Sequence, residues 1–159
     1  MTINVRPMTR QNKPALMRIL RDTPEFKPAE VVVAEELIDA YLENPAAPDY
    51  FVLIAETGSD LAGYICYGPT PLTEGTWDVY WMATAREKRG QGVGGALLKA
   101  AEEKIRQAQG RLSVIETSTI PSYENTRRFY VGQGYQTIAT IPDFYEPGDG
   151  KLILLKLMR

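Results

Sequence analysis

The sequence contains no histidine, only one cysteine and no long hydrophobic run. Without histidine, the chain cannot form a serine–histidine triad or most zinc sites. Proton transfer would fall to carboxylates, tyrosine, lysine, cysteine, water or backbone groups. A single cysteine, Cys66, excludes an internal disulfide, and its position in an apolar strand between Ile65 and Tyr67 predicts a core thiol rather than a nucleophile.

No apolar stretch approaches the roughly 18 residues of a membrane helix, and the first seven residues lack the apolar centre of a signal peptide. We therefore expect a cytoplasmic protein with no membrane partner. The chain carries 18 basic and 20 acidic residues, a net charge of -2, which argues against nucleic-acid binding through bulk charge. A length of 159 residues and a hydrophobic content of 44% predict one globular domain over residues 1–159.

Hydrophobic periodicity and turn residues predict a mixed α/β fold. We expect strands at 3–6, 50–56, 61–67, 76–84, 112–117, 135–141 and 151–157, and helices at 11–21, 29–42, 93–109 and 122–132. The segment between the last two strands, which contains Pro147 and Gly148, is expected to be a loop. Strand, crossover helix and strand over residues 76–117 form a βαβ unit, so its two strands should be parallel neighbours.

Four glycines fall within six residues in the segment Arg89-Gly90-Gln91-Gly92-Val93-Gly94-Gly95, directly after a basic cluster. Glycine allows the backbone to approach a ligand closely, because no Cβ intervenes. The free N–H groups at the start of the following helix, with Arg89 beside them, favour an anion. The segment therefore predicts a site for a phosphate-bearing ligand.

Two interpretations of these glycines compete. Gly90-x-Gly92-x-x-Gly95, with Glu116 roughly 20 residues further on, fits the dinucleotide-binding fingerprint. In that fold the first glycine directly follows the strand, whereas residues 85–89 separate Thr84 from Gly90, and only one βαβ unit is present. We therefore treat this match as a coincidence. A P-loop is excluded, because no Gly-Lys-Ser/Thr follows the glycines.

As Arg-x-x-Gly-x-Gly, residues 89–94 resemble the cofactor-binding signature of the GNAT superfamily of N-acetyltransferases. Residues 79–84 are similar to the fourth strand of that family. Residues 126–135, Thr-Arg-Arg-Phe-Tyr-Val-Gly-Gln-Gly-Tyr, resemble its second signature, a helix that carries Phe-Tyr and ends in Gly-Phe/Tyr. The resemblance implies an α/β fold with a mixed, mostly antiparallel sheet of six to seven strands, a parallel pair splayed at the fourth and fifth strands, and helices on both faces.

The resemblance also implies acetyl-CoA as co-substrate and no metal. It places the pyrophosphate on the N–H groups of the glycine segment and the pantetheine arm along the end of strand 76–84. The implied cofactor-binding residues are Met82, Ala83, Thr84, Arg89, Gly90, Gln91, Gly92, Val93, Gly94, Gly95 and Phe129. Many family members have an asparagine that contacts the pantetheine; that position holds Tyr123 here, with Asn125 two residues later, so both are candidates.

Direct acetyl transfer to a primary amine, without a covalent enzyme intermediate, is the activity that the resemblance implies. It assigns Tyr130 as the acid beside the thioester sulfur, because a phenol can donate a proton to a leaving thiolate. The base is open between Asp78 and Glu116. Alternation along strand 76–84 predicts one face shared by Asp78, Tyr80, Met82 and Thr84, and likewise one face shared by Trp77 and Trp81.

The acceptor amine, a small molecule or a peptide, is open. Carboxylates at 22–28, Glu74 and 143–149 would attract a cationic amine or simply lie in solvated loops. The stretch 143–149, Asp-Phe-Tyr-Glu-Pro-Gly-Asp, is similar to that of a bacterial subgroup of the family. The alternative function is a non-catalytic CoA-binding sensor or partner module. We expect no nucleic-acid partner, and a homodimer is one possibility for the oligomeric state.

Overall fold

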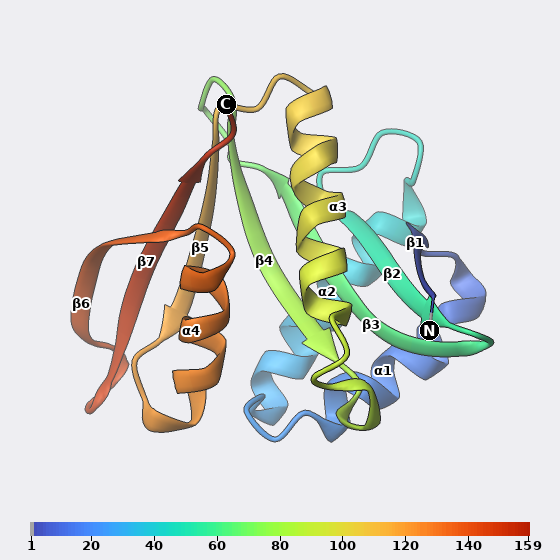
Figure 1. Ribbon diagram of the computed structural model, residues 1–159, viewed down its shortest axis with the longest axis horizontal. Helices are drawn as coiled ribbons and strands as arrows, with labels where there is room; N and C mark the ends of the chain where they lie inside the picture. Colours follow the sequence, from blue (N-terminus) through green and yellow to red (C-terminus); the bar gives the residue numbers. More distant parts are fainter. Residues whose placement is uncertain (1) are drawn as a thin grey trace.

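A seven-stranded mixed sheet forms the centre of the computed structural model, which describes residues 2–159 (Figure 1). The strands are β1 (Ile3–Pro7), β2 (Phe51–Thr57), β3 (Asp60–Pro69), β4 (Thr76–Thr84), β5 (Leu112–Ser118), β6 (Gln136–Glu146) and β7 (Asp149–Leu157). Their order across the sheet is β1-β2-β3-β4-β5-β7-β6. All neighbours are antiparallel except β4 and β5, which are parallel. The predicted fold class is thereby confirmed.

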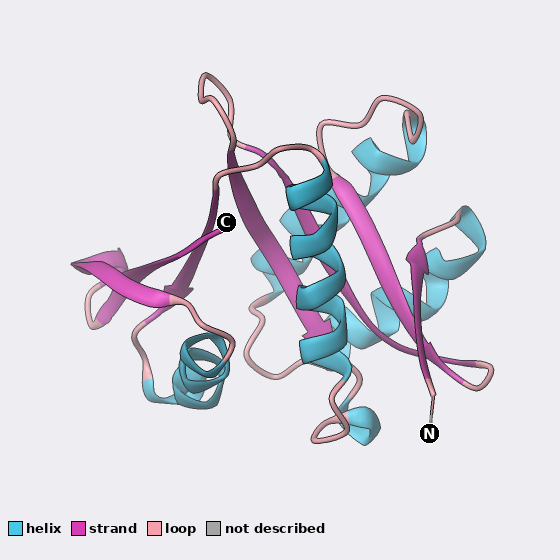
Figure 2. Cartoon of the chain, turned by 45° about the horizontal axis from the view of Figure 1, so that its top comes forward, coloured by secondary structure: helices cyan, strands magenta, loops and turns pink. Residues whose placement is uncertain are grey.

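Helices cover both faces of this sheet (Figure 2). They are α1 (Lys13–Asp22), α2 (Pro28–Glu43), α3 (Val93–Gln107) and α4 (Glu124–Gly132), with short 3₁₀ segments η1 (Arg10–Asn12), η2 (Arg86–Lys88) and η3 (Pro121–Tyr123). Pro28 occupies the first turn of α2, where a missing N–H costs nothing. Within residues 2–159 no helix is long and apolar enough to cross a membrane.

Two apolar clusters lie on opposite faces of the sheet. One packs α3 against it and includes Leu97, Ile115 and Leu154, all at most 2% exposed. The other packs α1 and α2 against the opposite face through residues such as Leu16 and Ile38, which are fully buried. Cys66 is buried in this second cluster, and burial raises the pKa of its thiol, so it stays protonated and inert as predicted. These two clusters divide the molecule into an α3–α4 side and an α1–α2 side.

The last two strands are longer than the sequence indicates. The segment expected to be a loop is mostly extended strand: β6 runs on to Glu146, which faces Asp149 of β7 across a tight turn at Pro147-Gly148. The ladder is irregular between Ile141 and Glu146. Pro142, which has no N–H, is tolerated there because β6 is the edge strand of the sheet. The loop prediction was wrong because an irregular edge strand lacks the regular alternation of a typical strand.

Candidate active site

The parallel strands β4 and β5 separate part of the way along their length (Figure 1). They pair from Thr76–Leu112 to Val79–Ile115, and no ladder pair joins the two strands beyond that point in the described chain. The facing edges of 80–84 and 116–118 border a cavity of about 1000 Å³. Backbone groups on an unpaired strand edge can hydrogen-bond an extended ligand as an added strand would. The separation therefore creates both the cavity and one of its binding surfaces.

The glycine segment forms one end of this cavity and requires glycine for two different reasons. Gly90 (φ 77°) and Gly92 (φ 88°) have left-handed backbone conformations that other residues rarely adopt. A Cβ on Gly94 would lie 3.3 Å from Cζ of Phe129, so a side chain there would fill the space between α3 and α4. Gly92 immediately precedes α3, so free helical N–H groups face the cavity. The geometry fits a pyrophosphate, with Arg89 at the cavity wall.

The structure brings together in this cavity all of the predicted site residues except Gln91. The side chain of Gln91 instead donates a 3.3 Å hydrogen bond to the carbonyl oxygen of Glu87. The predicted residues that line the cavity are Asp78, Met82, Ala83, Thr84, Arg89, Gly90, Gly92, Val93, Gly94, Gly95, Glu116, Tyr123, Asn125, Phe129 and Tyr130. Residues far apart in the sequence thus meet at one site, although their roles remain predictions.

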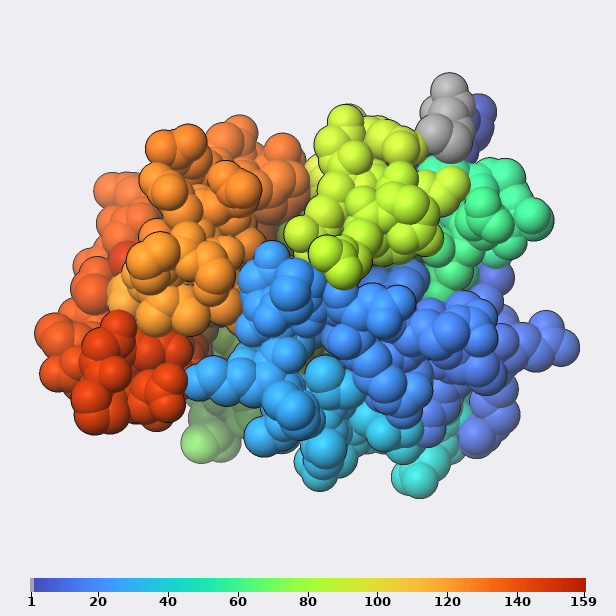
Figure 3. All heavy atoms as spheres, turned by 90° about the horizontal axis from the view of Figure 1, so that it is seen from below, coloured from blue at the N-terminus to red at the C-terminus, as the bar shows by residue number. Residues whose placement is uncertain are grey.

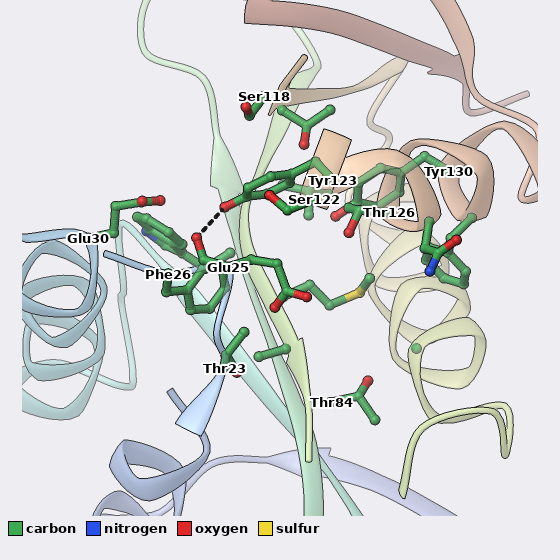
Figure 4. Close-up of a pocket in the computed structure, with 18 of the residues that line it drawn as sticks. Thr23, Glu25, Phe26, Glu30, Thr84, Ser118, Ser122, Tyr123, Thr126 and Tyr130 are labelled. Carbon is green, nitrogen blue, oxygen red and sulfur yellow. Dashed lines mark hydrogen bonds between the residues drawn. The ribbon is translucent and has the colours of Figure 1, made fainter. Parts of the chain in front are cut away.

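Tyr130 lies on α4 and points toward the cavity (Figure 4). It is 6% exposed, and this burial raises the pKa of its phenol to about 12. The hydroxyl is therefore protonated throughout the neutral range, as a proton donor must be. Its neighbour Phe129 is the less buried of the two, although both pack against the α3-side cluster.

A β-bulge in β4 overturns the predicted alternation along this strand. Opposite β3, the register shifts so that Val79 and Trp81 face consecutive residues, with Tyr80 as the extra residue. Tyr80 and Trp81 consequently both pack on the α1–α2 side, whereas Met82 packs on the α3 side with Trp77. The expected common face of Asp78, Tyr80, Met82 and Thr84 is therefore split in two, and Trp77 and Trp81 lie on opposite faces.

The two candidate bases have different surroundings. Asp78 Oδ2 accepts hydrogen bonds from Thr70 Oγ1 at 2.6 Å and from the Tyr80 hydroxyl at 3.4 Å. Glu116 forms a 2.7 Å ion pair with Lys151 and its side chain is 45% exposed. The ammonium of Lys151 offsets the charge of the Glu116 carboxylate, which is therefore already engaged in an ion pair. Among residues 2–159, Asp78 has no such cation partner, and both carboxylates stay candidates for the base.

Sequence analysis did not identify most of the wall on the α1–α2 side. Phe26, Lys27 and Glu30 come from the α1–α2 loop and α2, and Tyr145 and Asp149 from the β6–β7 hairpin. Only Glu25 and Asp149 among the loop carboxylates considered from the sequence line the cavity; Asp22, Glu74 and Asp143 do not. The missed residues had no local motif, because long-range pairing alone brings them to the cleft.

Contacts across the cleft hold the α1–α2 loop in place. The Tyr123 hydroxyl donates a 3.2 Å hydrogen bond to the carbonyl oxygen of Glu25 (Figure 4), and Lys27 forms a 3.0 Å ion pair with Glu146. Figure 3 shows the result from below: the blue N-terminal segment lies against both the yellow-green glycine region and the orange η3–α4 region. The loop therefore borders both the cofactor end and the opposite end of the cavity.

Comparisons with known proteins agree with this geometry. A crystal structure is known for a protein from Desulfovibrio desulfuricans that is assigned to the acetyltransferases of the GNAT family. The two sequences are 40% identical, and the structures superpose with a TM-score of 0.94 over 99% of this chain and 100% of that one. An aminoglycoside 6'-N-acetyltransferase complexed with coenzyme A is 19% identical, with a TM-score of 0.76 over 100% and 98% of the two chains. The second likeness establishes the fold alone.

A further relative is the uncharacterized N-acetyltransferase MJ1530 of Methanocaldococcus jannaschii, 31% identical over 104 residues. The match spans 65% of this chain and 64% of the archaeal protein, slightly less than two thirds of its length. Because these relatives are bacterial and archaeal, the resemblance to a bacterial subgroup stays a prediction. Residues 14–135 match the acetyltransferase (GNAT) family itself. Taken with the splayed strands and the glycine segment before α3, this match shows that the chain belongs to the GNAT family of acetyltransferases.

Proposed function

We propose that this protein transfers the acetyl group of acetyl-CoA directly to a primary amine. The observation that carries the proposal is the convergence of three features on one cavity: the glycine segment, the unpaired edge of β4, and the protonated phenol of Tyr130. A non-catalytic CoA-binding module would need the first two alone. Tyr130 and Asp78, a donor and an acceptor of protons in the same cavity, favour the enzyme.

The residues around the glycine segment would hold the cofactor. Backbone N–H groups from Gly90 to Gly95, with the guanidinium of Arg89, would bind the pyrophosphate. The free edge of β4 at Met82–Thr84 would pair with the pantetheine arm, and Asn125 or Tyr123 would contact it from the α4 side. Bound acetyl-CoA supplies the acetyl group as a thioester, so that the N–C bond forms as the C–S bond breaks.

The protein's own groups would handle charge and protons around that exchange. A primary ammonium has a pKa of about 10.4, so it must lose a proton before it can attack. Asp78, directly or through a water, would accept that proton. A backbone N–H at Met82–Ala83 would stabilise the negative charge that develops on the acetyl oxygen. Tyr130 would donate its proton to the departing sulfur and regain one from the attacking nitrogen, which loses its second proton as the amide forms, so that no further reactant is needed.

Calorimetry with acetyl-CoA and a thiol-release assay over a panel of amines test this proposal together. We expect binding and amine-dependent release of CoA; binding without release for any amine would support the sensor module instead. Gly92→Ala should weaken acetyl-CoA binding, because a left-handed conformation costs a non-glycine residue about 1 kcal/mol and the added methyl group crowds the bound phosphate. Gly132→Ala is the matched control, since its Cβ would meet nothing within 4 Å.

A further inference from the structure

The C-terminal end of α4 is tied to the residue that carries the proposed acid. In α4, which the structure describes in full, Tyr130 is the only buried residue, so apolar packing holds this nine-residue helix weakly. Beyond the helix, Gly134 takes a left-handed conformation with φ 96°. The N–H of Tyr135 donates a 3.1 Å hydrogen bond to the carbonyl oxygen of Tyr130, and that of Gly134 donates a 3.0 Å bond to Val131. The two bonds form a Schellman motif, which joins Tyr135 to Tyr130.

The side chain of Tyr135 extends this connection to other elements. Tyr135 is 3% exposed, and its ring lies against that of Tyr130, with centroids 6.2 Å apart. Its hydroxyl donates a 2.9 Å hydrogen bond to Oε2 of Glu102 on α3 and lies 2.8 Å from Oγ of Ser113 on β5. Since a phenol has a single proton, Ser113 is the donor in the second bond. Tyr135 therefore links the helix of the proposed acid to α3 and to the sheet.

Lys156 on β7 closes the network with its ammonium group. Nζ donates 2.9 Å hydrogen bonds to Oε1 of Glu102 and to the carbonyl oxygen of Gln133, the residue that caps the C-terminus of α4. A cation at this end of a helix also interacts favourably with the helix dipole. The stem of Lys156 passes beside Gly134, where an added Cβ would lie 3.3 Å from Cε. Both oxygens of Glu102 are thus engaged, and the end of α4 is held by two side chains.

Glu102 is an ionisable residue in a buried position, only 4% exposed, and none of the proposed chemical steps uses it. Glutamate is rarely buried, because the loss of hydration opposes the attraction between the ions. Buried polar networks in which every member is hydrogen-bonded make the groups that they join rigid. This rigidity suits a carboxylate that holds the end of a neighbouring helix in one place.

The anchoring of α4 to α3 bears on the transfer step. Both helices lie on the same side of the sheet (Figure 1), and α3 begins at the glycine segment that would bind the pyrophosphate. The cofactor and Tyr130 would therefore both take their positions from α3. A displacement of about 1 Å between reacting groups can lower a rate about a hundredfold. A rigid connection between the two helices would keep the phenol aligned with the thioester sulfur.

We propose that Glu102, Tyr135 and Lys156 are positioning residues, which hold the phenol of Tyr130 at the sulfur of the bound thioester. The inference rests on the proposed function and adds to it a set of residues that control the transfer step from outside the cavity. None of the three lines the cavity within residues 2–159, so they would act through Tyr130 and not by contact with cofactor or acceptor.

A double-mutant cycle separates this role from a general contribution to stability. Tyr135→Phe removes only a hydroxyl, and we expect it to lower kcat about tenfold with a nearly unchanged KM for acetyl-CoA. In a Tyr130→Phe background no phenol is left to position, so the same substitution should lower kcat by less than about twofold. Lys156→Met should behave like Tyr135→Phe in both backgrounds. Lys99→Met, which removes an exposed lysine on α3, is the matched control and should leave kcat unchanged.

Each outcome decides between the two proposals. An equal loss of kcat in both backgrounds, or no loss in either variant, would overturn the inference and leave the acetyltransferase proposal standing. If no amine releases CoA, the proposed function fails, and hydrogen exchange then tests the network by itself. Tyr135→Phe should speed exchange of the amides of residues 133–135 but not of those in α1, and unchanged rates would overturn the inference. Should Lys156→Met not fold, because it leaves Glu102 buried without its cation, Tyr135→Phe still decides.

Discussion

Arg89 and Glu25 form an ion pair across the mouth of the cavity, with Nη2 of the guanidinium 3.4 Å from Oε2 of the carboxylate. The same Glu25 accepts the hydrogen bond of Tyr123 through its backbone carbonyl. Arg89 is the side chain expected to bind a phosphate, and the carboxylate of Glu25 occupies part of its hydrogen-bonding capacity. Binding of a phosphate by Arg89 would therefore compete with a contact that holds the α1–α2 loop.

Glu25→Gln should strengthen CoA binding, because it removes the anion that competes for Arg89. A partly exposed ion pair contributes up to about 1 kcal/mol, so the Kd for CoA should fall roughly two- to fivefold. Calorimetry with CoA at low salt measures it, and the gain should shrink at high salt as the charges are screened. Glu87→Gln is the control, because it makes the same change in net charge near the glycine segment at a residue outside the cavity. An equal gain from both variants would show a general charge effect instead.

Tyr130→Phe should lower kcat about a hundredfold and leave the KM for acetyl-CoA nearly unchanged, because general acid catalysis acts on the transfer step and not on cofactor binding. Since burial raises the pKa of Tyr130 to about 12, the unmodified enzyme should show no loss of kcat from this group as pH rises to about 11. Steady-state kinetics from pH 7 to pH 10.5 checks both points. Tyr50→Phe serves as the control, because Tyr50 is a partly exposed tyrosine that does not line the cavity. An unchanged kcat in Tyr130→Phe would remove Tyr130 as the acid.

Local motifs account for the part of the site that the sequence predicted. The glycine segment and the Phe129-Tyr130 pair each occupy a few consecutive residues, so their spacing is visible in one dimension, and the βαβ pattern correctly predicted that β4 and β5 are parallel. The bulge at Tyr80 was not predictable, because an extra residue leaves the composition of a strand unchanged.

The α1–α2 side of the cavity depends on contacts that no local pattern encodes. Lys27 and Glu146 pair across 119 residues of sequence, and the order β5-β7-β6 brings Asp149 beside Ser118. The β6–β7 hairpin is also longer than expected, because the irregular edge strand hides its alternation. Sequence patterns therefore predicted the glycine-segment side of the cavity, which is built from neighbouring residues, and only two loop carboxylates beyond it, Glu25 and Asp149.

Asp78→Asn should lower kcat/KM for a strongly basic alkylamine about a hundredfold, because the substrate ammonium then has no group to accept its proton. Glu116→Gln should change kcat/KM by less than about threefold, since Lys151 already neutralises Glu116. The comparison is made at pH 7.5 with initial rates of CoA release. A weakly basic amine, already deprotonated at that pH, should rescue Asp78→Asn but not a variant damaged in structure. A larger defect in Glu116→Gln than in Asp78→Asn would reverse the assignment of the base.

Tyr64→Phe should stabilise the protein by about 1 kcal/mol, because the Tyr64 hydroxyl is fully buried and has no hydrogen-bond partner within residues 2–159. Chemical denaturation at pH 8 measures this gain, with Tyr50→Phe, whose ring is partly exposed, as the control. A loss of more than 1 kcal/mol in Tyr64→Phe would show that the hydroxyl has a stabilising partner.

The same substitution should matter more in alkaline solution. Burial raises the pKa of Tyr64 in the folded state, so its stabilising contribution is complete below the pKa of about 10 of an unfolded tyrosine and is lost as pH rises above it. The unfolded chain can then release a proton that the folded protein retains, which lowers the free energy of unfolding by about 1.4 kcal/mol per pH unit for each such group. Burial also raises the pKa of Tyr67 and Tyr135, so the protein should lose stability steeply above pH 10. Tyr64→Phe removes one of these groups. The difference in free energy of unfolding between the variant and the unmodified protein should therefore widen by about 1.4 kcal/mol between pH 8 and pH 11. This difference would stay constant if the Tyr64 phenol ionised equally in the folded and unfolded states.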